Sequence, residues 1–207
     1  MASPNRLTVL RMVLTPLFAY FLTRDPIYYK YFSLSVFFLA SITDWYDGYV
    51  ARKYGGITVI GKHLDPLADK LMISVAFGMF TWLGYVKFWM FALIVLRDFL
   101  ITGLRSYALF LNKPFTTTSF AKWKTFFQMF AIYCLFVWLI IKETYGGQDF
   151  PPGFIQDVEN WNLIEYLMLF VTALTLATGV SYVYDNRHHL KSMAVAFYRV
   201  FVPTNVR

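Results

Sequence analysis

The chain has 207 residues, of which 58% are hydrophobic, 21% aromatic and 15% charged, and its formal net charge is +7. This composition is too apolar for an ordinary soluble domain, and the single Cys134 excludes an intrachain disulfide. A helix of about twenty apolar residues spans a bilayer, and the sequence contains six runs near that length. We therefore predict an all-α integral membrane protein with one domain over residues 1–207.

The first apolar run imitates a signal peptide, because Arg6 and Arg11 precede or interrupt it. The following Thr23-Arg24-Asp25 offers no small-residue cleavage site, so we expect the segment to be retained as a span. Glycine, proline and asparagine mark the joints between the later runs. The six transmembrane helices are expected at 6–23, 31–51, 67–86, 88–111, 119–141 and 161–184.

The C-terminal tail carries apolar residues at helical spacing, with Lys191 and Arg199 off that stripe. This pattern predicts a helix that lies in the membrane interface, although a continuation of the sixth span is the alternative. The stripe consists of Leu190, Met193, Ala194, Phe197, Val200 and Phe201.

The distribution of basic residues predicts how the helical bundle is oriented in the membrane. Fifteen of the 19 lysines and arginines fall on the side that holds the N-terminus, the loops after spans two and four, and the C-terminus. Because Lys and Arg concentrate on cytoplasmic ends, this side is predicted to be cytoplasmic, most simply in a bacterial inner membrane, with an organelle membrane as the alternative. The positive charge is expected to attract anionic headgroups and phosphorylated metabolites, not nucleic acid.

Four aspartates stand in two pairs at this predicted cytoplasmic side. Asp44 and Asp47 are three residues apart, and Asp65 and Asp69 are four apart, so each pair shares one face of a helix. Four close carboxylates repel one another, and hard divalent cations with oxygen ligands relieve that repulsion. The alternative is a structural acidic cluster neutralised by the nearby Arg52, Lys53, Lys62 and Lys70.

Other residues near the aspartates suit a phosphate-containing ligand. Gly48 and Gly61 let a backbone or phosphate approach closely, and Arg52 matches phosphate oxygens. His63 is a competing candidate for a base or a metal ligand, although a loop histidine is the simpler interpretation. Together these residues predict a polar cleft that opens toward the cytoplasm and takes metal, phosphate and lipid.

The stretch from Asp44 to Asp69 matches the pattern D-x2-D-G-x2-A-R-x8-G-x3-D-x3-D at every fixed position. It resembles the CDP-alcohol phosphotransferase family in this respect. The resemblance implies a six-helix membrane enzyme, commonly a homodimer, that moves the substituted phosphate of a CDP-linked lipid to an alcohol and releases CMP. It also implies one or two Mg²⁺ or Mn²⁺ ions, held by Asp44, Asp47, Asp65 and Asp69.

The resemblance further implies individual roles. Asp69, the last acid of the pattern, would be the general base that deprotonates the attacking hydroxyl. The remaining pattern residues would cradle the cytidine diphosphate of the lipid, together with residues of an N-terminal stretch, Pro4 to Arg11, that resembles the opening of some family members. The candidate CDP-lipid-binding residues are Asn5, Thr8, Gly48, Ala51, Arg52 and Gly61.

Basic residues in the fourth and fifth spans bear on the accepting alcohol. Arg97, Arg105, Lys122 and Lys124 are predicted to line the same cleft, and Arg97 with Asp98 lies inside a span. An acceptor that carries its own phosphate would need such a cluster. The pattern resembles family members that transfer to glycerol 3-phosphate, which implies CDP-diacylglycerol and glycerol 3-phosphate as substrates. Ordinary helix-end cations are the alternative.

Two other functions stay open at this point. Within the family, a cardiolipin synthase would use phosphatidylglycerol as acceptor. A divalent-cation transporter would also place aspartates in helices, but transport sites tend to lie near the midplane between repeats, whereas these acids are predicted at helix ends on one side.

Overall fold

The computed structural model describes residues 4–54, 59–110, 120–145 and 153–187, and within them the side chains of 9–43, 46, 70–106, 123–145 and 153–187. All regular structure in these residues is helical, as predicted. The helices are α1 (Pro4–Leu22), α2 (Tyr28–Tyr54), α3 (Val59–Trp82), α4 (Phe88–Phe110), α5 (Phe120–Tyr145), α6 (Phe154–Asn160) and α7 (Leu163–Asp185).

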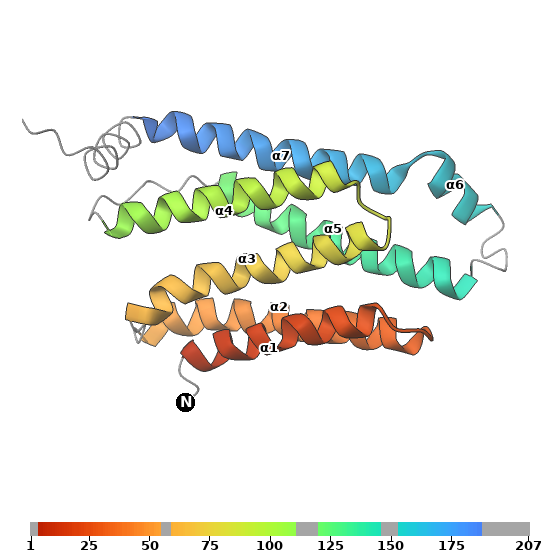
Figure 1. Ribbon diagram of the computed structural model, residues 1–207, viewed down its shortest axis with the longest axis horizontal. Helices are drawn as coiled ribbons and strands as arrows, with labels where there is room; N and C mark the ends of the chain where they lie inside the picture. The colour runs from red at the N-terminus through yellow and green to blue at the C-terminus, as the bar shows by residue number, and fades with distance from the viewer. Residues whose placement is uncertain (1–3, 55–58, 111–119, 146–152, 188–207) are drawn as a thin grey trace, which may run out of the picture.

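Six long helices run along the longest axis of the molecule in alternating directions, and the short α6 lies at one end (Figure 1). We call the end where α2 finishes at Tyr54 and α3 begins at Val59 the signature end. The opposite end, with the connections 23–27 and 83–87, is the turn end. The start of α1 and the end of α4 also lie at the signature end (Figure 1).

The six expected spans correspond to the six long helices, with two differences. The third helix begins at Val59, eight residues before the predicted start at 67, so Pro66 lies inside it. The expected bounds follow the apolar run, and the helix continues outward from that run through polar residues such as Lys62 and Asp65. The short α6 was not predicted, because its seven residues carry no apolar run. The expected C-terminal interfacial helix lies outside the described residues.

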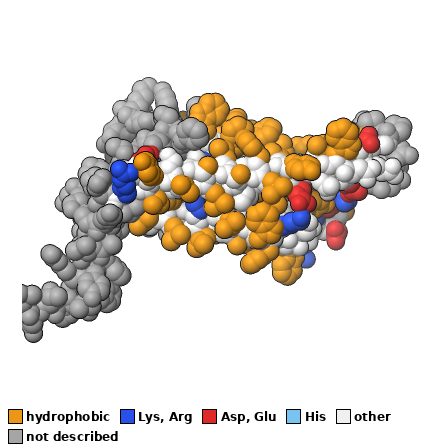
Figure 2. Space-filling view, turned by 90° about the horizontal axis from the view of Figure 1, so that it is seen from above, with side chains coloured by type: hydrophobic (Ala, Val, Ile, Leu, Met, Phe, Trp, Pro, Cys, Tyr) orange, Lys and Arg blue, Asp and Glu red, His pale blue; other side chains and the backbone are white. Residues whose placement is uncertain are grey.

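Two of the described helical segments, Trp123–Tyr145 and Leu163–Asp185, are long and apolar enough to cross a membrane. The outer surface agrees with this, because large apolar side chains are widely exposed along the helices. Hydrophobic side chains extend along the visible face in Figure 2, and Trp82, Phe88 and Val180 are 70% exposed or more. Soluble monomers rarely expose apolar surface on this scale.

An aromatic core joins four helices in the half of the bundle nearer the turn end. Phe37 of α2 packs against Phe18 of α1 and Phe136 of α5, with ring centroids 5.4 Å and 5.6 Å apart. Phe136 in turn meets Phe80 of α3 edge to face at 5.0 Å. All four rings are fully buried, and such pairs add to the hydrophobic gain of burial.

A buried lysine of α2 bonds to the end of α1 at the turn end of the bundle. The Lys30 ammonium donates hydrogen bonds to the carbonyl oxygens of Leu22, at 2.8 Å, and Arg24, at 3.0 Å. It also lies 3.6 Å from a Glu143 carboxylate oxygen of α5. The last carbonyl groups of a helix lack hydrogen-bond donors within the helix. Lys30 of α2 donates to the carbonyl of Leu22, the last residue of α1, and to that of Arg24 in the connection after it.

We expect Lys30→Met to lower the free energy of unfolding by about 1–3 kcal/mol, because it leaves the buried Leu22 carbonyl oxygen and the partly buried Arg24 carbonyl oxygen without this donor. Thermal unfolding of the purified protein in detergent measures this. Lys87→Met is the matched control: Lys87 pairs with Glu165 at the same end, but both side chains are largely exposed, so the loss should stay under about 1 kcal/mol. Equal losses in the two variants would contradict the capping role.

Candidate active site

The eight predicted signature residues lie on two helices that meet at one end of the bundle (Figure 1). Their backbone is described and their side chains lie outside the described ones. The helix α2 carries Asp44, Asp47, Gly48, Ala51 and Arg52, and α3 carries Gly61, Asp65 and Asp69. The intervening residues 55–58 are few, so the two sets are held at the same end.

The two acidic pairs stand at matching levels along the bundle. Asp44 precedes the end of α2 at Tyr54 by ten residues, and Asp69 follows the start of α3 at Val59 by ten. With a rise of about 1.5 Å per residue, each lies about 15 Å from its helix end. Because the two helices run in opposite directions from this end, the pairs lie at a common depth.

Next to the signature, a buried carboxylate gathers three cations from three helices. Lys124 of α5 donates a hydrogen bond to Asp98 Oδ1 of α4, and Arg97 donates to the same oxygen at 3.2 Å. Gln128 Nε2 of α5 donates to Asp98 Oδ2 at 3.2 Å. Lys70 Nζ of α3 lies 4.0 Å from Oδ2. We call these five residues the Asp98 cluster.

The Asp98 cluster is enclosed: Asp98 and Lys124 are each 2% exposed, and Gln128 is fully buried. Among the described side chains, three formal positive charges face one formal negative charge here. Buried charge is costly unless it is paired, so charged groups at this depth of a membrane helix usually have a function. An anion that neutralises the remaining charge would bind here favourably.

Two further polar atoms of the Asp98 cluster are buried. Arg97 donates from its second terminal nitrogen to Thr178 Oγ1 of α7 at 3.0 Å, which extends the cluster to a fourth helix. Within the described part of the chain, Arg97 Nε and Gln128 Oε1 have no hydrogen-bond partner. The cluster therefore retains unused hydrogen-bonding capacity.

The structure brings together two of the four predicted acceptor residues, Arg97 and Lys124. The predicted Lys122 side chain lies outside the described ones, and Arg105 is exposed two helical turns farther along α4. The interior position expected for Asp98 is confirmed. From the sequence, Lys70 was considered only as a cation that could neutralise the four signature aspartates, and Gln128 and Thr178 were not singled out.

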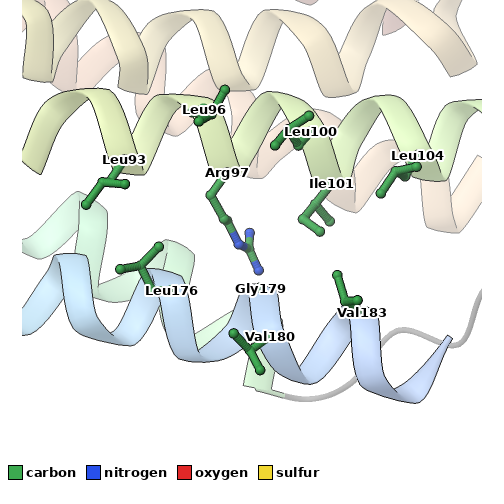
Figure 3. A pocket seen from close by; sticks show the side chains of 10 residues that line it. All are labelled: Leu93, Leu96, Arg97, Leu100, Ile101, Leu104, Leu176, Gly179, Val180 and Val183. Atoms are coloured by element: carbon green, nitrogen blue, oxygen red, sulfur yellow. The ribbon is translucent and has the colours of Figure 1, made fainter. Parts of the chain in front are cut away.

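A groove between α4 and α7 borders the cluster. Its volume is about 450 Å³, and Figure 3 shows Arg97 pointing from α4 across it toward Gly179 among leucine, isoleucine and valine side chains. A Cβ atom at Gly179 would lie 3.1 Å from Arg97 Cγ and Nε. The absent side chain at Gly179 thus leaves the space that the Arg97 side chain occupies.

The comparison with known families follows this geometry. A family model described as CDP-alcohol phosphatidyltransferase matches residues 1–180, which include the signature and the Asp98 cluster. The chain belongs to the CDP-alcohol phosphatidyltransferase family. The resemblance inferred from the eight signature positions is confirmed at the level of the family.

Curated relatives within the CDP-alcohol phosphatidyltransferase family carry one name. A Rickettsia bellii protein is 35% identical over 181 residues, covering 86% of this chain and 92% of the relative. A Bacillus subtilis protein is 33% identical over 145 residues, covering 64% of this chain and 75% of the relative. Each is named CDP-diacylglycerol–glycerol-3-phosphate 3-phosphatidyltransferase.

Because Gly179 contacts Arg97, we predict that a Gly→Ala change affects the free energy of unfolding differently at Gly179 and at Gly103. Gly103 has open space where a Cβ would be, so Gly103→Ala should raise the free energy of unfolding by about 0.5–1 kcal/mol through helix propensity. Gly179→Ala should lack this gain or lose stability, because Arg97 must move by a few tenths of an ångström. Thermal unfolding in detergent compares the two variants. An equal gain in both would show that Arg97 does not require the space.

Proposed function

We propose that this protein transfers the phosphatidyl group of CDP-diacylglycerol to sn-glycerol 3-phosphate, giving phosphatidylglycerophosphate and CMP. The observation that carries the proposal is the complete eight-residue signature, placed on two helices that meet at one end of the bundle. The family match and the common name of the curated relatives support the same reaction.

The signature aspartates suit divalent cations chemically. Asp44, Asp47, Asp65 and Asp69 supply only hard oxygen donors, and their two helices bring them to a common depth, so these residues would hold Mg²⁺ or Mn²⁺, as two ions in our proposal. When bound, such ions polarise phosphoryl oxygens and stabilise the departing phosphate.

The other signature residues hold the donor lipid in this proposal. Arg52 binds pyrophosphate oxygens by charge-assisted hydrogen bonds, while Gly48 and Gly61 let the phosphates approach the backbone. Ala51 keeps the adjacent helix surface small. At the start of α1, Asn5 and Thr8 contribute further polar contacts to the CDP group.

Asp69 then acts as the general base. It accepts the proton of the attacking glycerol hydroxyl while that oxygen forms a bond to the phosphorus that bears the diacylglycerol. The bond from this phosphorus to the bridging oxygen of the pyrophosphate breaks, and its electron pair leaves with CMP. The reaction thus transfers the proton to Asp69, forms one phosphate ester bond and breaks one pyrophosphate bond.

The Asp98 cluster favours an acceptor that carries a phosphate monoester. Among the described side chains, the cluster has three cations and one carboxylate, and this excess of two formal positive charges matches a phosphate near charge −2. The phosphodiester of phosphatidylglycerol, the acceptor of a cardiolipin synthase, carries one negative charge. Arg97 and Lys124 are the proposed central contacts, and Arg105 and Lys122 the proposed contacts at the entrance.

The proposed setting is a bacterial inner membrane crossed by six helices, with the signature end and both termini in the cytoplasm and the protein a homodimer. The asymmetry of lysine and arginine along the sequence supports this orientation. It places the cleft where soluble glycerol 3-phosphate and released CMP can exchange with the cytoplasm.

We expect purified protein with Mg²⁺ or Mn²⁺ to release CMP from CDP-diacylglycerol only when glycerol 3-phosphate is added. Asp44→Asn, Asp47→Asn, Asp65→Asn and Asp69→Asn should each lower the rate about 100-fold or more, because each removes a metal ligand or the base. Asp157→Asn, an exposed change in α6 at the turn end, is the matched control and should keep the normal rate.

Three results would contradict this assignment. Near-normal rates in any two of the signature variants would exclude the acidic quartet as the catalytic centre. CMP release with phosphatidylglycerol but not with glycerol 3-phosphate would support the cardiolipin synthase instead. Ion flux in liposomes without any CMP release would support a transporter.

The orientation is tested by cysteine labelling of intact cells with an impermeant reagent, in a Cys134→Ser background. Gly55→Cys and Asn112→Cys should be protected at the cytoplasmic side, while Gly147→Cys and Lys87→Cys should react. Labelling at position 55 without labelling at 147 would reverse the proposed topology.

A further inference from the structure

The three cations of the Asp98 cluster are not equivalent. Lys124 is 98% buried and hydrogen-bonded to Asp98, and Arg97 bonds both Asp98 and Thr178. Lys70 differs from both, because its ammonium lies 4.0 Å from the carboxylate, beyond hydrogen-bonding distance, and its side chain is 20% exposed. By its contacts with the described side chains, Lys70 is therefore the least tightly held of the three cations and can turn toward an incoming anion.

The position of Lys70 in the chain links two parts of the proposed site. It follows Asp69 directly on α3, so the cation stands at the level of the proposed base. Glycerol 3-phosphate carries its phosphate two carbons from the reacting hydroxyl. A base and a phosphate contact for this molecule must therefore come from nearby positions. Successive side chains of a helix point in different directions, but Lys70 follows Asp69 directly and its long side chain can place the ammonium near the same substrate.

Asp98 explains how the cations are held before the substrate binds. Without a carboxylate between them, Lys70, Arg97 and Lys124 would repel one another in a poorly solvated interior. Asp98 binds the buried Lys124 and Arg97 directly, and Gln128 fixes its second oxygen. The carboxylate is then largely committed to these three hydrogen-bond donors, and its weaker interaction with Lys70 is the one that a phosphate can replace.

We propose that Lys70 is a further acceptor-binding residue, whose ammonium contacts the phosphate of glycerol 3-phosphate, and that Asp98 is a positioning residue for the cations around it. This inference rests on the proposed function. It adds a phosphate contact from α3, beside the signature, to those expected from α4 and α5. The acceptor is thereby bridged between the helix that carries the base and the helices that carry the other cations.

The test uses the purified full-length protein, with CMP release measured while each substrate is titrated separately at saturating Mg²⁺. Losing one charge-assisted contact should raise the KM for glycerol 3-phosphate about 10- to 100-fold in Lys70→Met. The KM for CDP-diacylglycerol should change less than about threefold, since Lys70 is not proposed to touch that lipid. Lys70→Arg keeps the charge and should retain most of the affinity.

Two controls separate a binding role from a structural one. Lys87→Met removes an exposed cation at the turn end and should leave both KM values unchanged. Lys70→Gln, which retains a polar head, is the second neutral variant and should show the same selective rise in KM. If both neutral variants fail to fold, Lys70 is required for the fold and the inference is overturned.

The remaining outcomes distinguish this inference from the proposed function. A normal KM for glycerol 3-phosphate in Lys70→Met, with an active wild type, overturns the role of Lys70 and leaves the proposed reaction intact. An equal rise in both KM values also overturns it, because the effect would then not be specific to the acceptor. Wild-type protein that releases no CMP with glycerol 3-phosphate overturns the reaction itself, and the acceptor contact with it.

Discussion

Contacts from three helices converge on the Asp98 carboxylate, and the packing of the polar half of this bundle depends on them. It joins α4 to α5 through Lys124 and Gln128, and α3 approaches it through Lys70. Through Arg97 and Thr178 the same network reaches α7. Removing one partner from a buried charge pair is far more damaging than the net value of the pair suggests, because the other charge stays buried. The positions of four helices near the signature therefore depend on one side chain.

The two halves of the bundle are stabilised by different interactions. Near the turn end, the rings of Phe18, Phe37, Phe80 and Phe136 fill the interior, and Lys30 satisfies the last carbonyls of α1. Toward the signature end, charged and amide side chains occupy interior positions. Apolar packing is insensitive to a substrate's charge, whereas the polar half can respond to one. In the proposed function, the apolar half would support a polar site that binds highly charged molecules.

The sequence predicted the helical class, the six long helices and the family, because apolar run length and an eight-position motif are local properties. The span expected from the apolar run begins at 67, whereas α3 begins at Val59, because the helix continues through polar residues beyond that run. The sequence identified Arg97 and Lys124 but considered Lys70 only as a partner for the signature aspartates. Whether such a residue faces a carboxylate on another helix depends on the angles between helices, which spacing within one helix cannot give. The metal-binding and catalytic roles of the four signature aspartates remain predictions.

The pairing of α1 with α2 has a consequence for how the chain enters the membrane during synthesis. The Lys30 contacts to Leu22 and Arg24, and the Ser33 hydrogen bond to the carbonyl of Phe18, all lie within the first two helices. A helical hairpin with its own contacts can form before later segments emerge, since chains fold from the N-terminus as they are made. The first acidic pair, Asp44 and Asp47, would then enter the bilayer ahead of its partners on α3. Its charge must be tolerated there by the hairpin alone until the cations of the following helices, Lys70, Arg97 and Lys124, arrive.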